Sequence, residues 1–300
     1  MKTVVFICGS TAIGKTSVAI EIAKWLNTEI ISFDSRQFFK ELKIGAAPPS
    51  ETELNEVKHH LVGQLSLSQD YNSGDFETDA LQKIKQILKT KDQVVLVGGS
   101  GLYMKVLCEG FDDMPKVDPE IRAKLKLDLK KKGLMSLLDE LGSKDPVYYK
   151  KVDKHNPQRI LRALEIIRAT KMPFSSFHKK KKVKRPFNIV KIGLNMDREK
   201  LYQRINTRVD SMMDAGLLDE VKSLLDYKDH NSFKTVGYRE FIPFFDEEVN
   251  LEQAVEEVKK NSRHYAKRQL TWFKKDSEIK WFHPEKLEDI KTYLPAVLKK

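Results

Sequence analysis

Hydrophobic residues near the start of the chain gather in short, nearly continuous runs that alternate with amphipathic segments. Three of these runs have the length of strands buried on both faces of a parallel sheet, namely Val4–Cys8, Ile30–Phe33 and Val94–Val97. Between the last two, apolar residues recur at helical spacing over Phe76–Leu88. This order of elements predicts an α/β fold with a doubly wound parallel sheet.

After Pro115 the pattern becomes helical and later returns to the α/β type. Helices are predicted over Pro119–Lys132, Gly133–Leu141 and Pro157–Thr170, followed by a strand at Phe187–Leu194. The remaining elements are predicted as helices at Arg198–Asp226 and Leu251–Lys275 and a short strand at Ile279–Phe282. We therefore expect two domains, an α/β core formed by residues 1–112 and 188–300, and a helical insertion formed by residues 113–187.

The positive charge of the chain is concentrated in and beside the predicted insertion. The net charge is +11, and the segment Lys116–Lys191 holds 22 lysines and arginines against 8 acidic residues. The rest of the chain has 32 basic and 35 acidic residues. A solvated surface usually mixes the two signs, whereas a partner with many phosphates favours this asymmetry. The insertion is therefore predicted to bind nucleic acid, with the basic run HKKKKVKR (residues 178–185) as part of that surface.

Composition narrows the class of protein further. The chain has two cysteines, Cys8 and Cys108, which are too few for a disulfide framework or a cysteine zinc site. No apolar run approaches membrane-spanning length, and the N-terminus has no signal-peptide pattern. We expect a soluble cytoplasmic protein that does not enter a membrane.

A phosphate-binding motif follows the first predicted strand. Residues 9–16, GSTAIGKT, match G-x-x-x-x-G-K-[ST], with a strand pattern before them and a helical pattern after them. In that context backbone N–H groups face an anion, the lysine supplies charge and the threonine hydroxyl lies near Mg²⁺. The predicted phosphate-binding residues are Gly9, Ser10, Thr11, Ala12, Ile13, Gly14, Lys15 and Thr16.

P-loop hydrolases usually carry an acidic residue that helps to hold Mg²⁺ at the end of a second buried strand, and this chain has none at the corresponding position. The strand in VVLVGGSGLY ends in glycines and Ser100, whereas the acid follows the other strand, in IISFDSRQ, as Asp34. This placement argues against attack of water on a γ-phosphate. Asp34 could accept a proton from a nucleophile, or it could only cap a turn. Ser100 is likewise either a hydroxyl at the active edge of the sheet or part of a Gly-rich turn.

Several arginines could meet phosphates. Arg204 and Arg208 are four residues apart and share one helix face, which suits either a pyrophosphate or salt bridges. The predicted helix Pro157–Thr170 carries Arg159, Arg162 and Arg168, for which a solvated helix face is the alternative.

Nine short stretches make the chain similar to the tRNA dimethylallyltransferase family, whose members prenylate the adenosine beside the anticodon. Besides the P-loop they are ISFDSRQ, YNSGDF, VGGSGLYMKVLCEGF, DPEIRAKL, NPQRILRALEI, LYQRINTRVDSMMDAGLLDEV, TVGYREF and AKRQLTWFK. The resemblance runs over nearly the whole chain. Two cysteines cannot build the zinc finger of the eukaryotic branch, so the bacterial type matches better.

The resemblance implies a P-loop that holds the diphosphate of dimethylallyl diphosphate, which is then a leaving group. The dimethylallyl group would pass to N6 of the adenosine 3′ to the anticodon in tRNA, with Mg²⁺ as cofactor, in a monomeric enzyme. Asp34 would be the general base and Ser100 a second catalytic residue, while Lys15, Thr16 and Arg208 would hold diphosphate and metal. The residues implied to contact the anticodon stem-loop are Asp34, Ser35, Arg36, Gln37, Ser100, Arg122, Gln158, Arg159, Arg162, Gly237, Tyr238 and Arg239.

Three stretches depart from the family pattern. Ser10 stands where proline is common, and Ser100 stands where threonine is usual. The family's IGTAKP reads IGAAPPS at residues 44–50, which removes a hydroxyl at Ala46 and a lysine at Pro48. Two alternatives stay open. One is an enzyme of free nucleotides, either a nucleotide kinase or an isopentenyl transferase acting on AMP or ADP, and the other is a tRNA-binding paralogue with reduced activity.

Overall fold

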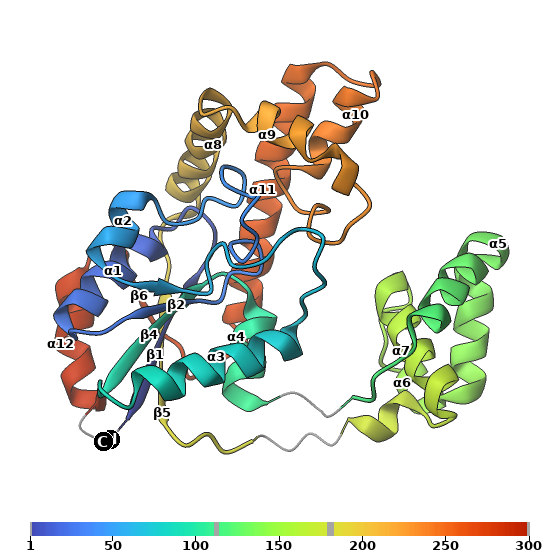
Figure 1. The fold of residues 1–300 in the computed structure, drawn as a ribbon, viewed down its shortest axis with the longest axis horizontal. Coiled ribbons are helices and arrows are strands. Elements are labelled where there is room, and N and C mark those ends of the chain that lie inside the picture. The colour runs from blue at the N-terminus through green and yellow to red at the C-terminus, as the bar shows by residue number, and fades with distance from the viewer. Residues whose placement is uncertain (1, 111–113, 179–182, 299–300) are drawn as a thin grey trace. The chain divides into compact units, whose positions relative to one another are not determined.

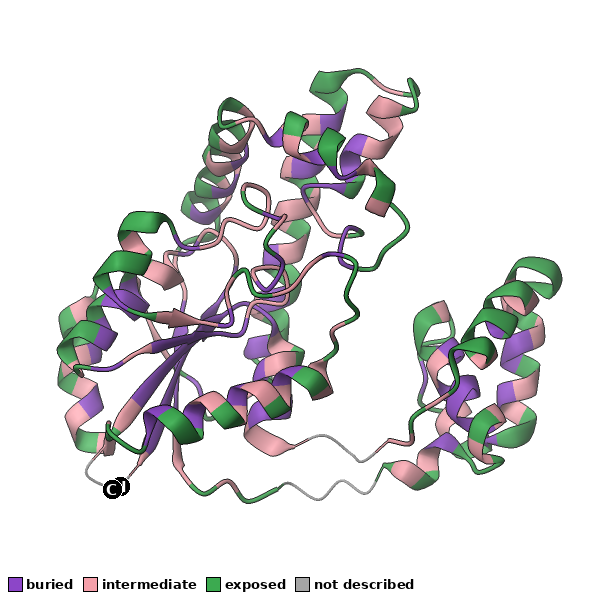
Figure 2. Ribbon diagram, viewed as in Figure 1, coloured by how far each residue is buried: buried purple, intermediate pink, exposed green. Residues whose placement is uncertain are grey.

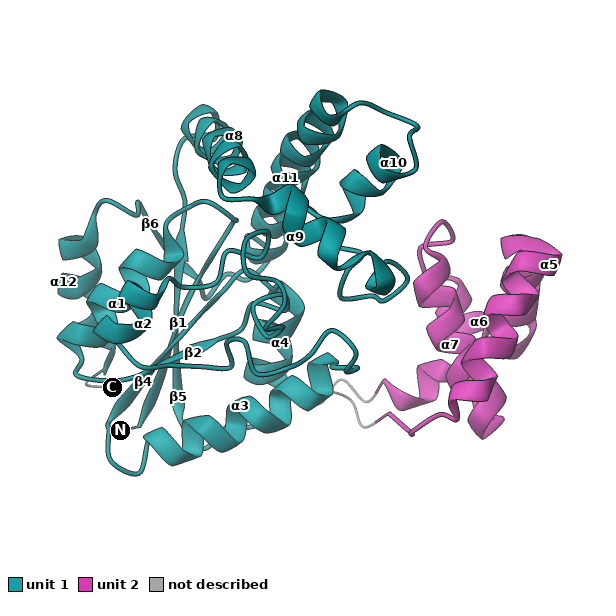
Figure 3. Cartoon of the chain, turned by 45° about the horizontal axis from the view of Figure 1, so that its top comes forward, with its two compact units in different colours: residues 1–109, 184–300 teal, residues 110–183 magenta. Residues whose placement is uncertain are grey.

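The computed structural model describes residues 2–110, 114–178 and 183–298. Figure 3 shows two compact units, which are treated separately below. The core unit consists of Met1–Glu109 with Lys184–Lys300, and the insert unit consists of Gly110–Val183.

The core unit is built on a six-stranded parallel sheet with the strand order β3-β2-β4-β1-β5-β6 (Figure 1). Its strands are β1 (Thr3–Gly9), β2 (Ile30–Ser32), β3 (His59–His60), β4 (Gln93–Gly98), β5 (Asn188–Leu194) and β6 (Lys280–Phe282). The order along the chain reverses at β1, which confirms the predicted doubly wound sheet. Because every strand is parallel, the loops after β1, β2, β4 and β5 all leave from one edge of the sheet.

Helices of the core unit lie on both faces of this sheet and beyond the ends of its strands (Figure 1). They are α1 (Lys15–Trp25), α2 (Glu51–Glu56), α3 (Ser73–Ile87), α4 (Gly101–Glu109), α8 (Arg198–Asp214), α9 (Leu217–Ser223), α10 (Ile242–Phe245), α11 (Leu251–Phe273) and α12 (Leu287–Leu298), with short 3₁₀ turns at Leu225–Tyr227 and Arg239–Phe241. Those that lie beyond the strand ends are α8, α9 and α10. The prediction of one helix over Arg198–Asp226 was wrong, because Gly216 adopts φ 92° and separates α8 from α9. Within the described part of the chain, no helix is long and apolar enough to cross a membrane.

Alternating side chains of β1 show how the two faces are sealed. Val4, Phe6 and Cys8 belong to the buried cluster that includes α3, α4 and much of α11, while Val5 and Ile7 belong to the cluster formed with α1 and α12. Figure 2 shows buried residues along the strands and exposed ones on the outer faces of the helices. Burial of side chains of this size stabilises the fold by roughly 1.5–3 kcal/mol each.

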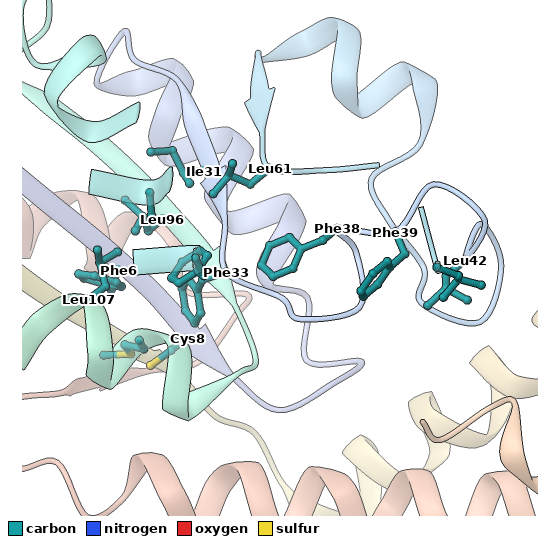
Figure 4. Close-up of a cluster of buried hydrophobic side chains, with 14 of the residues drawn as sticks. Phe6, Cys8, Ile31, Phe33, Phe38, Phe39, Leu42, Leu61, Leu96 and Leu107 are labelled. Atoms are coloured by element: carbon teal, nitrogen blue, oxygen red, sulfur yellow. The ribbon is translucent and has the colours of Figure 1, made fainter. Parts of the chain in front are cut away.

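An aromatic run anchors the segment that follows β2 (Figure 4). Phe38, Phe39 and Leu42 are buried in the same cluster as the sheet residues Phe6 and Leu96. The ring of Phe38 stacks on Phe76 of α3, with centroids 5.7 Å apart. This packing fixes the start of the next loop, residues 43–49, which we call the wall loop.

The insert unit has a small core of its own. It contains α5 (Pro119–Lys144), α6 (Pro146–Tyr149), α7 (Pro157–Thr170) and a 3₁₀ turn at Phe174–Phe177. Gly133 interrupts α5 with φ 76° and ψ 174°, so two helices meet there, at the predicted break. Leucines from α5 and α7 pack together, among them Leu137, Leu141 and Leu164. Within the predicted basic run, residues 178–185, the four lysines at 179–182 lie outside the described residues.

One arginine fixes the point where the chain returns to the core unit. The Arg185 guanidinium donates to the carbonyl oxygens of Val106 and Leu107 at 2.9 and 2.8 Å, and it pairs with Glu77 of α3. These bonds cap the end of α4. Residues 184–187 therefore belong to the core unit, although the sequence pattern placed them at the end of the insertion.

Candidate active site

Two adjoining cavities open at the edge of the sheet where the strands end. The large cavity has a volume of about 810 Å³ and is lined by the P-loop, the ends of β2 and β4, the wall loop and one face of α8. The small cavity, of about 90 Å³, lies between the P-loop, α8, α11 and residues 235–237. Six residues line both cavities and mark their junction, namely Thr11, Ala12, Lys15, Asp34, Ala46 and Arg208.

The P-loop takes the form that its motif predicts. It connects β1 to α1, and its backbone turns at Gly14 with φ 97° before the helix begins at Lys15. The Lys15 ammonium donates to the Ser10 carbonyl at 2.7 Å and also lines the cavities. At the other end of the loop, the Thr11 amide donates to the Gln269 side chain at 2.8 Å. The loop is therefore held in shape by the protein itself, with the start of α1 directed at the cavity.

Two cations, Lys15 and Arg208, share the junction with the one carboxylate of Asp34, and Arg204 lines the large cavity. In the described part of the chain, neither Arg204 nor Arg208 forms an ion pair with a carboxylate. A guanidinium nitrogen of Arg204 lies 3.5 Å from the point where a Cβ on Gly14 would be. Of the two uses left open by the sequence, this geometry favours binding of an external anion such as pyrophosphate over salt bridging.

Asp34 lies at the junction and also shapes its own turn. Its Oδ1 accepts a hydrogen bond from the Arg36 amide at 3.0 Å, and its own amide donates to Ser32 Oγ at 3.2 Å. Both roles suggested by the sequence are thus compatible, because one oxygen serves the turn and the Oδ2 oxygen has no hydrogen-bond partner among the described residues. The carboxylate lines both cavities.

Ser100 is placed behind Asp34 rather than beside the cavities. Its hydroxyl accepts a hydrogen bond from the Ser35 amide at 3.0 Å and donates one to Ser35 Oγ at 3.2 Å. It is buried and lines neither cavity. In this geometry Ser100 holds the turn that carries Asp34, and its predicted part in catalysis would be indirect.

Two residues of α11 belong to the site although the sequence did not single them out. Gln269 is buried, accepts from Thr11 as described and donates to the Gly99 carbonyl at 2.9 Å, so it joins the P-loop to the turn after β4. Tyr265 lines the small cavity, where burial raises the pKa of its phenol to about 12 and nearby Asp34 adds to the effect. The available signal for Gln269 was its place in AKRQLTWFK, one of the stretches that carry the family resemblance, and Tyr265 immediately precedes that stretch.

Comparisons with known proteins identify the family. A family model described as IPP transferase matches residues 37–276. The chain is also 52% identical, over 276 residues, to a tRNA dimethylallyltransferase of Christiangramia forsetii, which covers 92% of this chain and 91% of that protein. The chain belongs to the IPP transferase family. Membership confirms both the predicted family and the predicted class of enzyme, a prenyltransferase.

Solved structures of this IPP transferase fold agree along nearly the entire chain. A full-length tRNA isopentenylpyrophosphate transferase from Bacillus halodurans matches with a TM-score of 0.75 and 36% identity, covering 100% of this chain and 97% of that one. A eukaryotic dimethylallyltransferase acting on tRNA matches with a TM-score of 0.81 and 27% identity, covering 99% of this chain and 77% of that one.

The residues of the core unit that the family resemblance assigns to tRNA differ in accessibility. The Gln37 amide lines the large cavity but is engaged, accepting from Ser32 Oγ at 3.0 Å and donating to the Ala47 carbonyl at 2.9 Å. Arg36 and Gly237 line the small cavity, and Arg239 is exposed. Tyr238 is fully buried, so its side chain packs inside the protein rather than facing an RNA.

In the insert unit, the four predicted RNA-binding residues lie on α5 and α7. Gln158 and Arg159 are exposed in the first turn of α7. Arg122 and Arg162 both pair with the buried Glu165 carboxylate at 3.1 Å while keeping exposed surface. The carboxylate therefore holds two guanidinium groups together on one surface of this IPP transferase insert.

The pH dependence of substrate capture follows from the environment of Lys15. Burial lowers the pKa of its ammonium to about 8, although Asp34 opposes this effect. The charged form predominates below pH 8 and is the form that can attract an anionic substrate such as a diphosphate. For such a substrate, kcat/KM should therefore fall up to about tenfold per pH unit above 8. Steady-state rates between pH 6 and 10 would measure this. Lys15→Arg should remove the inflection, because a guanidinium stays charged, whereas a wild-type profile flat to pH 10 would contradict the assignment.

Proposed function

We propose that this chain transfers a dimethylallyl group from dimethylallyl diphosphate to N6 of the adenosine 3′ to the anticodon in tRNA, releasing pyrophosphate. The observation that carries the proposal is the junction of the two cavities. There the cations Lys15 and Arg208 and the carboxylate of Asp34 line the same space. An anion site next to a possible general base is what displacement of a diphosphate by an amine requires.

The proposed reaction breaks the bond between the allylic carbon and the diphosphate oxygen as the bond to N6 forms. Lys15, Arg208 and the P-loop amides would stabilise the charge that develops on the departing pyrophosphate. Asp34 Oδ2 would take the proton that the amine loses. The adenine must leave its stack to reach the junction, as in other enzymes that act on a base.

The residues around the P-loop fit a Mg²⁺ ion bound together with the substrate. Among the described residues, no three His, Cys, Asp or Glu side chains are arranged to hold a metal. Mg²⁺ in phosphate sites often needs few protein ligands, because phosphate oxygens and waters supply the rest. The Thr16 hydroxyl lines the large cavity and has no hydrogen bond to any described residue, which suits it as one ligand. Bound there, Mg²⁺ would neutralise charge on the leaving pyrophosphate.

The basic insert supports tRNA rather than a free nucleotide as the acceptor. A mononucleotide offers too few phosphates to use the 22 basic residues of the segment Lys116–Lys191. We further propose that the enzyme acts as a monomer in the cytoplasm, where its tRNA substrate is found.

Salt dependence tests the four lysines at residues 179–182 of the basic run. Replacement of these four lysines by glutamine should weaken tRNA binding and flatten the plot of log affinity against log salt concentration, by about 0.7–0.9 for each phosphate that is no longer neutralised. Fluorescence anisotropy with an anticodon stem-loop at several salt concentrations measures the slope. Four lysines of the core unit, Lys83, Lys85, Lys89 and Lys91, provide a matched control. Equal slopes in both variants and the wild type would make the run a solvated surface.

A direct assay decides the function. Labelled dimethylallyl diphosphate and Mg²⁺ are offered with an unmodified anticodon stem-loop and, separately, with AMP. Label on the RNA alone is the expected result. Label on AMP would move the activity to free nucleotides, and tight salt-sensitive RNA binding without transfer would indicate a paralogue of reduced activity.

A further inference from the structure

One carboxylate on α9 holds the wall loop. Glu220 accepts hydrogen bonds from the backbone amides of Lys43, Ile44 and Gly45 at 3.0, 2.8 and 3.1 Å. It also accepts one from the Tyr238 hydroxyl at 2.6 Å. Four donors thus converge on two oxygens, and the three amides are consecutive along the chain.

The donors require an ionised acceptor at position 220. All four groups donate, so an amide side chain would present its own N–H₂ to at least one of them. Burial raises the pKa of the Tyr238 phenol and the Glu220 carboxylate adds to the effect, so this hydroxyl remains a donor. Charge-assisted bonds of this kind are stronger than neutral ones.

Close packing of Gly45 against the Tyr238 ring also fixes the wall loop. A Cβ at Gly45 would lie 2.5 Å from the Tyr238 ring, so the backbone can rest there only because residue 45 is glycine. At its other end the loop is held by the bond from Gln37 to the Ala47 carbonyl. The loop therefore has two fixed ends and a defined path between them.

That path forms part of the wall of both cavities. Gly45 and Ala46 line the small cavity, and Ala46 through Pro49 line the large one. Ala46 is one of the six residues of the junction, where Lys15, Asp34 and Arg208 also lie. Glu220 itself lines neither cavity.

We propose that Glu220 is a positioning residue that keeps the wall loop closed over the junction and so excludes water from the allylic carbon. This inference rests on the proposed function. If the wall opens, water competes with the N6 amine. The bond from carbon to diphosphate oxygen breaks, water oxygen bonds to that carbon and loses a proton to solvent, and dimethylallyl alcohol and pyrophosphate result. Exclusion of such side reactions is a known role of closed active sites.

The test compares three variants of the full chain with the wild type. Glu220→Gln disrupts the acceptor set, and Tyr238→Phe removes only the hydroxyl bond. Glu41→Gln is the matched control, because Glu41 also holds a loop, accepting from Ser66 Oγ at 2.7 Å and the Leu67 amide at 3.0 Å, but lines neither cavity. The readouts are the thermal midpoint, kcat and KM for the stem-loop, and the ratio of dimethylallyl alcohol to prenylated RNA.

The alcohol ratio should rise at least tenfold in Glu220→Gln and by a smaller factor in Tyr238→Phe. The kcat of Glu220→Gln should also fall by about tenfold to a hundredfold, the effect of small misplacements in an active site. Glu41→Gln should lower the thermal midpoint without changing the ratio. If Glu220→Gln only lowers the midpoint and leaves the ratio at the wild-type value, the proposal is overturned. If that variant does not fold, an unchanged ratio in Tyr238→Phe overturns it instead.

Hydrogen exchange separates this proposal from the proposed function. Amides 43–45 should exchange at least tenfold faster in Glu220→Gln than in the wild type, with or without substrate, while amide 67 should respond only in Glu41→Gln. A wild-type protein that transfers no prenyl group would defeat the proposed function while this exchange pattern could still be observed. If the exchange rates of amides 43–45 were unchanged in Glu220→Gln, the proposed positioning role of Glu220 would be wrong, whether or not the protein transfers a prenyl group.

Discussion

Asp34→Asn should lower the rate of prenyl transfer by about 10²–10⁴-fold, the usual contribution of a general base. The amide oxygen can still accept the Arg36 hydrogen bond that Oδ1 accepts, so the turn should survive. What is lost is the proton acceptor at the junction of the cavities. Single-turnover rates at saturating stem-loop RNA measure the effect, and Asp34→Ala should be at least as slow.

RNA affinity distinguishes a base from a binding residue in this experiment. The dissociation constant for the stem-loop should change by less than about threefold in both variants. Asp197→Asn is a suitable control, because Asp197 caps α8 and lines neither cavity. Affinity that falls in parallel with rate would make Asp34 a contact to RNA instead of the base.

Arg208→Ala should reduce kcat/KM for dimethylallyl diphosphate by about 10²–10³-fold, as expected when one group that stabilises a leaving anion is removed. Burial lowers the pKa of this guanidinium and Asp34 opposes that effect, but no ion pair with a described carboxylate occupies it. Its charge is therefore available to the substrate.

Steady-state kinetics with pyrophosphate as a product inhibitor provide a second measure of the same site. The inhibition constant for pyrophosphate should rise together with the loss in kcat/KM. Arg263→Gln serves as the control, because Arg263 also contacts α8, donating to Asn206 at 2.7 Å, but lines neither cavity. Equal effects of the two substitutions would assign the loss to the packing of α8.

The sequence predicted the parts of the site that are contiguous in the chain. The P-loop has its strand before it and its helix after it, so eight residues in a row specify both the shape and the charge. Asp34 could be placed at the active edge because parallel strands end on the same side of a sheet. The break between α8 and α9 was missed because apolar periodicity continues across Gly216, whose backbone conformation alone ends the helix.

Other parts of the site depend on contacts across long separations that no local pattern encodes. Gln269 bonds to Thr11 across 258 residues, and Glu220 reaches the wall loop across 175–177 residues. A buried glutamine or an acidic residue on a short helix can serve many structural purposes. Its role becomes clear only when the tertiary structure shows which group it binds. The sequence left open whether Ser100 faces the active edge or serves the turn, because the direction of its hydroxyl toward Ser35 depends on tertiary packing.

The position of β1 between β4 and β5 has a consequence for synthesis on the ribosome. β5 begins at Asn188, after the entire insert unit, so one edge of β1 lacks its partner while residues 10–187 are made. At translation rates of about 5–20 residues per second that interval lasts on the order of 10–40 seconds. An open edge of this kind invites pairing with other chains. The insert unit has its own core and can form during the interval. Arg208 and Gln269 can join the P-loop only after the insert unit and β5 have been made, so the nascent enzyme completes its candidate active site after its insert unit.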